Sequence, residues 1–311
     1  MTVSVIIVNW RTPDALRGCI ESVQAQVRAP ARQIIVVDNA SGDGSAEMVA
    51  ERFPDAHLIA NDENSGFAVA CNQGMGVATG EFVLLLNPDT VVPPETLATV
   101  LEFAEKRPDA AVIGCRVINA DGSLERTCFR FPSLLNIVLS ASCLNKFFPR
   151  NRFFGREFMG WWDRNTERDV DVVTGSFMLV RRQAIDQIGL MDERYFMYVE
   201  EADWCYRFAQ AGWKATFTPI AHIVHLSSRS SNQCWPKMYV WQNKSVLLFL
   251  EKWHGKTARR AASFVLALSV LPRAAFWWFA KTAGLARERA ASQSAATAAA
   301  LRFHLTGAIP D

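Results

Sequence analysis

Short apolar runs alternate with amphipathic stretches through most of the chain. One run covers Phe82 to Leu86, with Gly80 before it and Asn87-Pro88 after it. Such an unbroken run is too short for an isolated helix and predicts a strand that is buried on both faces. Further strands are predicted at residues 3–8, 33–37, 57–60, 111–115, 170–174, 177–180 and 214–218.

Helix signals lie between these runs. Thr12-Pro13-Asp14 combines a capping hydroxyl, a proline at the first helical position and an acid in the first turn. Gly80 and Gly189 follow two other helical stretches, as C-terminal caps do. Helices are expected at residues 67–78, 94–107, 182–188 and 200–210. The alternation predicts an α/β fold with a Rossmann-like, mostly parallel nucleotide-binding sheet.

Composition divides the chain into three parts. Residues 1–250 hold the α/β pattern, residues 251–289 are rich in apolar and basic side chains, and residues 290–311 form an Ala/Ser-rich tail, expected to be a weak helix or frayed. Within the first part, residues 131–165 mix aromatic and basic side chains without clear periodicity. That segment is either a lid or acceptor-facing insertion, or a helical excursion whose aromatic side chains belong to the core.

The part at residues 251–289 contains two apolar runs, which Pro272-Arg273 separates. A membrane span needs about 20 unbroken apolar residues, so the central Pro-Arg argues against a clean span. Basic flanks together with Trp277 and Trp278 favour amphipathic helices that lie at a membrane surface. Packing within the protein and a homodimer contact are the alternatives for the same face.

Charge and cysteine content exclude several classes of protein. The 33 basic and 31 acidic residues give a net charge of +2, which predicts no nucleic-acid partner. The seven cysteines are scattered without a C-x-x-C pair, which argues against a disulfide framework and a zinc site. Met1 leads directly into a strand, without the basic region and cleavage site of a signal peptide. A cytoplasmic protein with reduced thiols is expected.

Two acidic side chains directly follow predicted strands. Asp38 follows the second strand and Asp89 the fourth. Ligands of open α/β sheets bind outside the carboxyl ends of the strands, so both carboxylates are placed to meet a ligand or a metal. Asn64 and Gly66 open a helix whose N–H groups could face an anionic ligand. Local alternatives are an Asx turn at Asn87 and Asp89, a helix cap at Asp38 and a simple turn at Asn64.

Four local patterns at successive strand ends occur together. They are Val5-Ile6-Ile7-Val8-Asn9, Val36-Val37-Asp38-Asn39, Asn64-x-Gly66-Phe67-x-x-Ala70-x-Asn72-x-Gly74 and Leu86-Asn87-Pro88-Asp89. In these patterns the sequence resembles the family 2 glycosyltransferases of the GT-A fold, and specifically their rhamnosyltransferase-like branch, from residue 3 to roughly residue 250. The resemblance continues through Thr174-Gly175-Ser176, Asp192-Glu193, Phe196-Met197-Tyr198-Val199-Glu200-Glu201-Ala202-Asp203, Arg207, and His225 before Ser227 and Ser228.

The resemblance implies a metal site. Asp89 is the last residue of what corresponds to the family's D-x-D motif, which would hold Mg²⁺ or Mn²⁺ on the donor's diphosphate. Asn87 stands at the first acidic position, so one anionic ligand is missing. His225 would be a second metal ligand or a phosphate contact, and His222 is the weaker candidate. A structural role is the alternative for His225.

The resemblance also implies a catalytic base. Glu201 stands where the family has the Asp of a Glu-Asp pair, the general base that takes the proton of the acceptor hydroxyl. Alternatively, Glu200 and Glu201 only complement a helix dipole. Asp203 and Arg207 would fix the geometry of the pair. The residues implied to bind the donor nucleotide are Val8, Asn9, Asp38, Asn64, Gly66, Asn72 and Asn87.

The expected activity is that of an inverting glycosyltransferase. The donor would be a dTDP- or UDP-sugar, with dTDP-rhamnose as the first expectation, and the acceptor a saccharide or polyprenyl-linked saccharide of the cell envelope. The Gln-x-x-Arg-Trp signature of processive synthases is not evident, so one or a few sugars per acceptor are expected. The expected location is the inner face of the cell membrane. A non-catalytic nucleotide-sugar-binding or scaffold relative is the alternative, because Asn87 and Glu201 depart from the family pattern.

Overall fold

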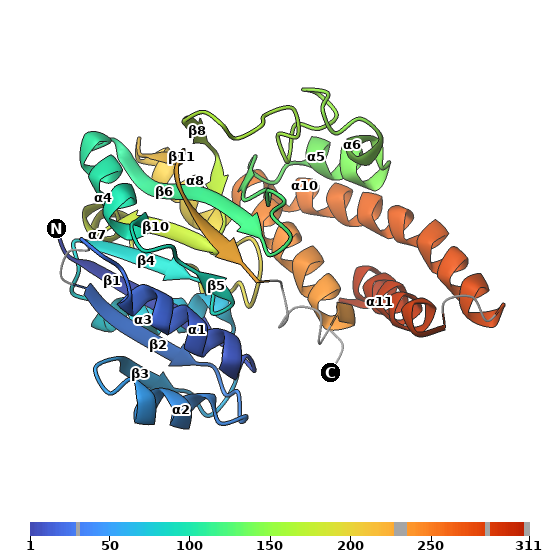
Figure 1. Ribbon diagram of the computed structural model, residues 1–311. Helices are drawn as coiled ribbons and strands as arrows, with labels where there is room; N and C mark the ends of the chain where they lie inside the picture. Colours follow the sequence, from blue (N-terminus) through green and yellow to red (C-terminus); the bar gives the residue numbers. More distant parts are fainter. Residues whose placement is uncertain (29–31, 227–234, 284–286, 308–311) are drawn as a thin grey trace. The chain divides into compact units, whose positions relative to one another are not determined.

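The computed structural model describes residues 1–28, 32–226, 235–283 and 287–307 (Figure 1). Ser227 and Ser228 lie outside the described residues. The chain forms two compact units. The first unit consists of Met1–Phe131, Trp162–Phe196 and Glu200–Ser230, and the second consists of Pro132–Trp161, Met197–Val199 and Ser231–Asp311.

A mixed, mostly parallel sheet forms the centre of the first unit. Its strands follow the order β3 (His57–Ala60), β2 (Arg32–Asp38), β1 (Val3–Asn9), β4 (Phe82–Leu86), β10 (Phe177–Arg181), β6 (Ala110–Asn119), β11 (Lys214–His225) and β5 (Thr90–Val91), and β8 (Arg168–Val170) pairs with β11. Strand β10 is antiparallel to both of its neighbours, whereas β1, β2, β3 and β4 are mutually parallel. A separate small sheet pairs β7 (Cys128–Phe129) with β9 (Val172–Val173). The predicted α/β class is confirmed.

Helices cover both faces of this sheet, which explains why its central strands are apolar throughout. The helices of the unit are α1 (Pro13–Gln24), α2 (Ser45–Arg52), α3 (Phe67–Val77), α4 (Thr96–Lys106), α7 (Arg182–Ile188) and α8 (Glu200–Gln210). Val5 and Ile7 of β1 belong to one buried cluster with Leu16 of α1. The intervening Ile6 faces α3, where a Cβ added to Gly74 would lie 2.6 Å from Ile6 Cγ2. Alternate residues of β1 are therefore buried on opposite faces.

The strand predicted at residues 214–218 is too short. In the structure β11 continues to His225, and its register against β6 shifts between Thr218 and His222. The shift passes over Pro219, which has no N–H to give to a neighbouring strand. Beyond the shift, β11 also pairs with β5, so that His225 lies opposite Thr90.

The second unit is helical. Its helices are α5 (Leu134–Ala141), α6 (Leu144–Phe147), α10 (Trp235–Thr282) and α11 (Arg287–Thr306), and α10 packs against α5 and α11. The break within α10 lies at Gly255, whose φ of 83° and ψ of 171° are not helical, while Pro272 stays inside the helix. Within the described residues, the Ala/Ser-rich tail is helical as far as Thr306. Alanine favours the helix, and buried Ala290, Ala296 and Ala300 permit close packing.

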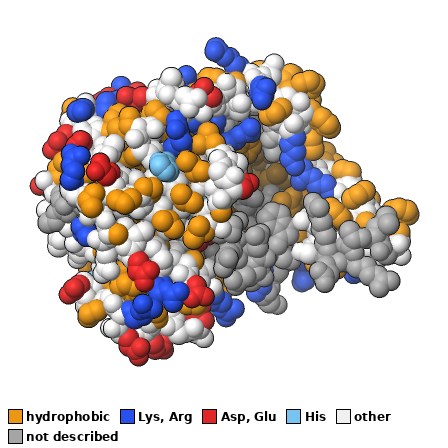
Figure 2. Space-filling view, in the orientation of Figure 1, with side chains coloured by type: hydrophobic (Ala, Val, Ile, Leu, Met, Phe, Trp, Pro, Cys, Tyr) orange, Lys and Arg blue, Asp and Glu red, His pale blue; other side chains and the backbone are white. Residues whose placement is uncertain are grey.

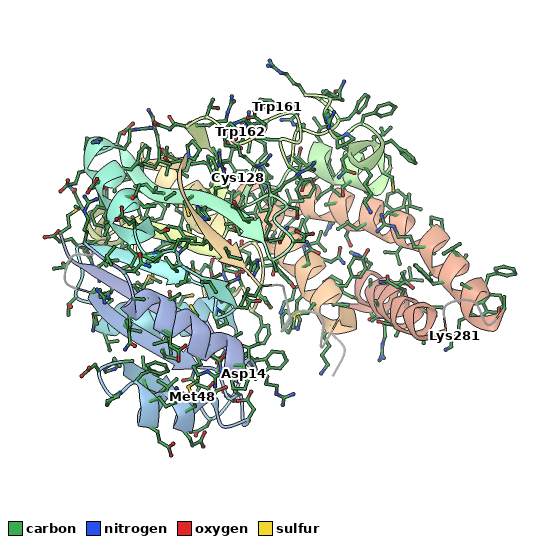
Figure 3. The ribbon with its side chains drawn as sticks, viewed as in Figure 1. Asp14, Met48, Cys128, Trp161, Trp162 and Lys281 are labelled. Atoms are coloured by element: carbon green, nitrogen blue, oxygen red, sulfur yellow. The ribbon has the colours of Figure 1, made fainter. Side chains whose placement is uncertain are left out.

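One described helix, Lys237–Thr282, is long and apolar enough to cross a membrane, judged by length and composition alone. A single helix of this kind also occurs in proteins without a span. Its apolar side chains are largely exposed, and Figure 2 shows hydrophobic side chains at the C-terminal end of α10. Phe276, Trp278 and Phe279 are each at least 60% exposed, and Lys281 follows them at the end of the helix (Figure 3).

Candidate active site

Strand pairing brings the predicted donor residues to one edge of the sheet. Asn9 and Asp38 end β1 and β2 and lie opposite each other in the parallel register. Half-buried Val8 precedes this edge by one residue. Strand β4 runs parallel to β1 on its other side, so the loop at residues 87–89 leaves the sheet at the same edge.

Asp38 is buried and fixes its own loop. Its Oδ1 accepts hydrogen bonds from Asn9 Nδ2 (2.8 Å) and Ser41 Oγ (2.6 Å), and its Oδ2 accepts one from the Ser41 N–H (3.1 Å). Asp38 does not cap α2, because Asp43 Oδ1 accepts the hydrogen bond from Ser45 N–H there. The network holds the Asp38 carboxylate at the sheet edge in one orientation.

Asn39 connects this edge to the next loop, and the sequence analysis gave it no role of its own. Its Nδ2 donates to Asn64 Oδ1 (2.9 Å) and to the Gly66 carbonyl (3.3 Å), and its Oδ1 accepts from Ser65 N–H (3.2 Å). Asn64 Oδ1 also accepts from Gly66 N–H (3.0 Å). The position of Asn39 directly after Asp38 was the one sequence feature that could have indicated its role. Asn39 therefore determines where Asn64 and Gly66 lie.

Gly66 is required by a close backbone contact. It has a φ of 89° and a ψ of 170°, and a Cβ at this position would lie 2.5 Å from the carbonyl oxygen of Phe196. The next residue, Phe67, donates its N–H to the same carbonyl at 2.8 Å. The start of α3 is thus hydrogen-bonded to the segment that precedes α8.

We expect Gly66→Ala to lower the free energy of unfolding by about 2–5 kcal/mol, since it adds backbone strain and a steric clash. Gly42→Ala is the matched control, because Gly42 has a φ of 62° but nothing within 4 Å of its added Cβ. The control should lose only about 1 kcal/mol. Urea unfolding of both variants measures the difference, and equal losses would show that the contact with Phe196 contributes nothing.

The amide of Asn72 is used within the protein. Its Nδ2 donates to the Met191 carbonyl (3.0 Å) and to Glu193 Oε1 (2.9 Å), and its Oδ1 accepts from Met191 N–H (3.0 Å). Asn72 thereby ties α3 to the loop before residue 194. A direct contact between Asn72 and the donor remains a prediction.

The pairing of β5 with β11 joins the two predicted metal ligands. His225 Nε2 lies 3.0 Å from Asp89 Oδ1, and His225 Nδ1 lies 2.7 Å from Glu125 Oε2. The Leu226 N–H also donates to the Asp89 carbonyl at 2.8 Å. His222, the weaker candidate, is exposed. Glu125 was missed because it meets His225 across a long sequence separation, and no local pattern marks it.

Two carboxylates control the charge of His225. Burial alone would lower the pKa of the imidazole, but the hydrogen bonds with Asp89 and Glu125 outweigh it and raise this pKa to about 10. Without a metal, the ring is therefore protonated at neutral pH and donates from both nitrogens. Deprotonated, it would offer Nε2 as a ligand while Glu125 holds Nδ1–H, the arrangement common around metal-bound histidines.

The side chain of Asn87 lies at the same turn. It is half-buried, and its backbone N–H donates to the Ser176 carbonyl at 3.3 Å. Its side-chain amide makes no hydrogen bond with any described residue. Among the described residues, no group of three or more histidine, cysteine, aspartate or glutamate side chains could hold a metal ion. Asp89 and His225 are the two predicted metal ligands that meet at this turn.

Glu201 lies in the first turn of α8 and is half-buried. Its Oε1 accepts a hydrogen bond from the Gly175 N–H at 3.0 Å, and a Cβ at Gly175 would lie 3.3 Å from that oxygen. Burial raises the pKa of the Glu201 carboxyl, although the Gly175 N–H opposes the rise. The carboxylate is therefore a stronger base than an exposed one.

A hydrogen-bonded bridge connects Glu201 to the loop of Asp89, and the backbone directly before α8 is strained. Gly175 binds Glu201, and the next residue, Ser176, accepts the hydrogen bond from Asn87 N–H, so a dipeptide bridges the two loops. Tyr198 and Val199, directly before α8, have φ values of 69° and 70°. Such values are strained for a β-branched residue, and strain of this kind concentrates at functional sites.

The neighbours of Glu201 in α8 fix its helix. Asp203 is fully buried and accepts hydrogen bonds from Tyr195 Oη (3.3 Å) and Arg207 Nε (3.2 Å). Arg207 also donates to the carbonyls of Ile188 and Leu190. These contacts hold α8 against the preceding loop, which fits the positioning role expected for Asp203 and Arg207.

The chain is similar in sequence to two rhamnosyltransferases. An N-acetylglucosaminyl-diphospho-decaprenol L-rhamnosyltransferase from Mycobacterium tuberculosis is 29% identical over 264 residues, which cover 80% of this chain and 84% of the relative. Rhamnosyltransferase WbbL from Escherichia coli is 25% identical over 259 residues, which cover 80% and 93% of the two chains.

A solved structure shares the fold. Mannosyltransferase PcManGT from Pyrobaculum calidifontis, in complex with GDP-Man and Mn²⁺, superposes with a TM-score of 0.58 at 18% identity, covering 98% of this chain and 87% of the other. The fold is therefore the GT-A fold of glycosyltransferases. Residues 4–189 match the family described as "Glycosyl transferase family 2". Because that match spans more than half of the chain, and the sheet and strand ends follow the family's pattern, this protein belongs to glycosyl transferase family 2.

Proposed function

We propose that this glycosyltransferase inverts the configuration of the sugar that it transfers, with Glu201 as general base and Asp89 and His225 as ligands of a divalent metal. The observation that carries the proposal is the bridge formed by Gly175 and Ser176, which links Glu201 to the loop of Asp89. A base on one side and a diphosphate site on the other suit a single displacement at the anomeric carbon.

Glu201 supplies the proton-transfer chemistry. The second oxygen of its carboxylate accepts the proton of the acceptor hydroxyl. At the same time the hydroxyl oxygen of the acceptor bonds to the anomeric carbon, and the bond between that carbon and the donor diphosphate breaks. The Gly175 N–H holds the other carboxylate oxygen and so orients the base. Attack from the side opposite to the diphosphate inverts the anomeric configuration. Burial keeps the carboxylate basic enough to take part.

The side chains at Asp89 fit a divalent metal whose remaining ligands come from the donor. A carboxylate and an imidazole converge there, and Glu125 orients the imidazole from behind. A bound metal would neutralise the charge that develops on the leaving diphosphate. Carboxylate and phosphate oxygens suit Mg²⁺ and Mn²⁺ alike. An imidazole nitrogen binds Mn²⁺ better than it binds the harder cation Mg²⁺, so His225 favours Mn²⁺.

The donor's nucleotide would lie along the edge formed by Asn9, Asp38 and the Asn64–Gly66 loop. Asp38 Oδ2 accepts one hydrogen bond from the described residues, so it can accept another from a base N–H or a ribose hydroxyl. The Asn39 network presents the start of α3, where N–H groups and the helix dipole attract a phosphate.

The names of both relatives support rhamnose as the transferred sugar, and the name of the Mycobacterium tuberculosis relative supports a saccharide linked to a polyprenyl diphosphate as the acceptor. An acceptor of this kind is held in a membrane by its hydrocarbon chain. The exposed aromatic side chains of α10 and the basic residues beside them suit binding to the cytoplasmic membrane surface. We therefore place the reaction at the inner face of the cell membrane.

A donor panel tests the proposal. The purified protein is heated with Mn²⁺ and, in turn, dTDP-rhamnose, UDP-glucose, UDP-N-acetylglucosamine and GDP-mannose. The true donor should raise the melting temperature by mass action. Transfer of rhamnose to a polyprenyl-diphosphate-linked N-acetylglucosamine, with an inverted anomeric centre by NMR, is the expected result. A donor that binds without transfer to any acceptor would favour the non-catalytic alternative.

The raised pKa of Glu201 predicts the acid limb of the pH profile. Only the ionised carboxylate accepts a proton, so kcat/KM should fall as the pH decreases through this pKa, and the fall should begin above the range of an ordinary carboxyl group. Rates measured from pH 5 to pH 9 at saturating Mn²⁺ give the midpoint. In Glu201→Asp the midpoint should move while the limb persists; an unmoved midpoint would assign the limb to another group.

A further inference from the structure

The second unit has a large excess of basic over acidic side chains. Its three segments contain 15 lysine and arginine residues against 4 aspartate and glutamate residues, a formal charge of +11, which leaves −9 for the first unit. The two nearly cancel in the net charge of +2. The second unit therefore has the electrostatic character of a domain with an anionic partner.

A cavity within this unit concentrates two of these cations. It has a volume of 320 Å³ and lies among α6, α10 and α11, lined by Lys146, Tyr239, Arg273, Trp277, Gln293, Ala296 and Thr297. Arg273 Nη1 donates to Tyr239 Oη at 3.4 Å. Neither Arg273 nor Lys146 makes an ion pair with a described residue. Two cations thus line a cavity without acidic side chains in its wall.

This lining suits an anion with several oxygen atoms. Arg273 can bind two oxygens with its planar guanidinium, Lys146 adds a second positive charge, and the hydroxyl of Tyr239 and the amide of Gln293 are neutral partners. The volume lies at the lower end of the range of about 300–1,000 Å³ for small-molecule sites. It suits a diphosphate group better than a whole nucleotide sugar.

Apolar side chains adjoin the cationic residues in the sequence. Phe147 and Phe148 follow Lys146 and are 76% and 53% exposed. Phe276 and Trp278 flank Trp277 and are 60% and 64% exposed. Exposed aromatics beside cations favour a ligand that carries a hydrocarbon chain together with its phosphates. A nucleic acid would offer no counterpart to this apolar surface.

We propose that the cavity lined by Lys146 and Arg273 binds the diphosphate of an isoprenoid-linked acceptor. This inference rests on the proposed function and adds a second anion site, separate from the donor's diphosphate site at Asp89. The hydrocarbon chain would leave along the exposed aromatic side chains of α6 and α10. The cavity would hold the diphosphate of the acceptor, which is the same whichever sugar the lipid carries.

Binding of a soluble isoprenoid diphosphate tests the inference without any transfer. The full chain is titrated with farnesyl diphosphate by calorimetry, with inorganic pyrophosphate and farnesol as the partial ligands. Arg273→Gln and Lys146→Gln should each weaken farnesyl diphosphate binding at least about tenfold, because each removes a charge-assisted contact. Arg273→Lys should lose less than Arg273→Gln. Arg260→Gln, an exposed arginine of α10 outside the cavity, is the matched control and should bind as the wild type does.

The outcomes separate this inference from the proposed function. Unchanged farnesyl diphosphate binding in both glutamine variants would overturn the inference even if rhamnose transfer is found. If the glutamine variants lose farnesyl diphosphate binding but the wild type transfers no sugar, the inference is supported and the proposed function fails. Vesicles of phosphatidylcholine with and without phosphatidylglycerol test the other source of lipid phosphate. If the glutamine variants lose phosphatidylglycerol binding but keep farnesyl diphosphate binding, the cavity is a general headgroup site and the inference is wrong.

Discussion

Glu201→Gln is expected to lower kcat by about 10²- to 10⁴-fold, the usual contribution of a positioned general base. Glutamine keeps an oxygen that accepts the Gly175 N–H, so the side chain should stay in place, but it cannot take a proton at neutral pH. The loss corresponds to about 3–5 kcal/mol in the activation barrier. Turnover is measured at saturating donor and acceptor, and the donor-induced rise in melting temperature should be unchanged.

Two further variants sharpen this prediction. Glu201→Asp installs the residue that the family carries here, and it should retain part of the activity because a carboxylate remains. Glu105→Gln removes an exposed carboxylate from α4 and should leave turnover unaffected. If Glu201→Gln turns over like the wild type while still folded, Glu201 is not the base. If the wild type binds donor yet transfers nothing, the non-catalytic alternative gains support.

The fold was largely predictable because burial determines the strands. The apolar runs in β1, β2, β4 and β10 lie between helices on two faces, so their composition marks their ends to within one or two residues. Glycine and proline marked most helix ends, because each restricts or frees the backbone at its own position. These signals need no knowledge of distant partners. The boundaries of α7 and α8 therefore agree with the sequence patterns that predicted them.

The arrangement of Asp89, His225 and Glu125 depends on contacts that no local pattern contains. Strand β11 reaches His225 only because its register shifts past Pro219, and that shift is fixed by pairing with β6. Thr90 and Val91 form a strand only because β11 lies beside them. Glu125 follows β6 in a loop, and its contact with His225 depends on both events. The resemblance supplied both Asp89 and His225, whereas the structure added the contact between them and the contact with Glu125.

Charge was the least informative property at the level of the whole chain. A net charge of +2 gave no reason to expect an anionic partner, yet the two units carry large charges of opposite sign. The second unit is assembled from segments that lie far apart in the sequence, so no window of residues contains the whole excess. Only the fold shows which residues belong to one unit, so that their charges can be added.

Asp89→Asn is the second change for which a large effect is expected, a loss of about 10²- to 10³-fold in kcat, as is found when one group that stabilises transition-state charge is removed. The substitution keeps the size of the side chain but removes the anionic ligand that pairs with His225. Added EDTA should abolish wild-type turnover, and Mn²⁺ should restore it. The melting temperature checks that the loss is not unfolding.

Asn87→Asp provides the opposite change at the same turn. Asn87 stands at the first acidic position of the motif and its side-chain amide contacts no described residue, so an aspartate adds a second carboxylate without removing a hydrogen bond. We expect this variant to reach half-maximal turnover at a lower Mn²⁺ concentration than the wild type, since affinity for a divalent cation rises with the number of anionic ligands.

Glu125→Gln should raise the Mn²⁺ concentration at half-maximal turnover by about 10- to 100-fold, because the Glu125 carboxylate sets the orientation and basicity of His225. A Mn²⁺ requirement that none of the three substitutions alters would mean that the metal binds elsewhere and that the pair of Asp89 and His225 is structural.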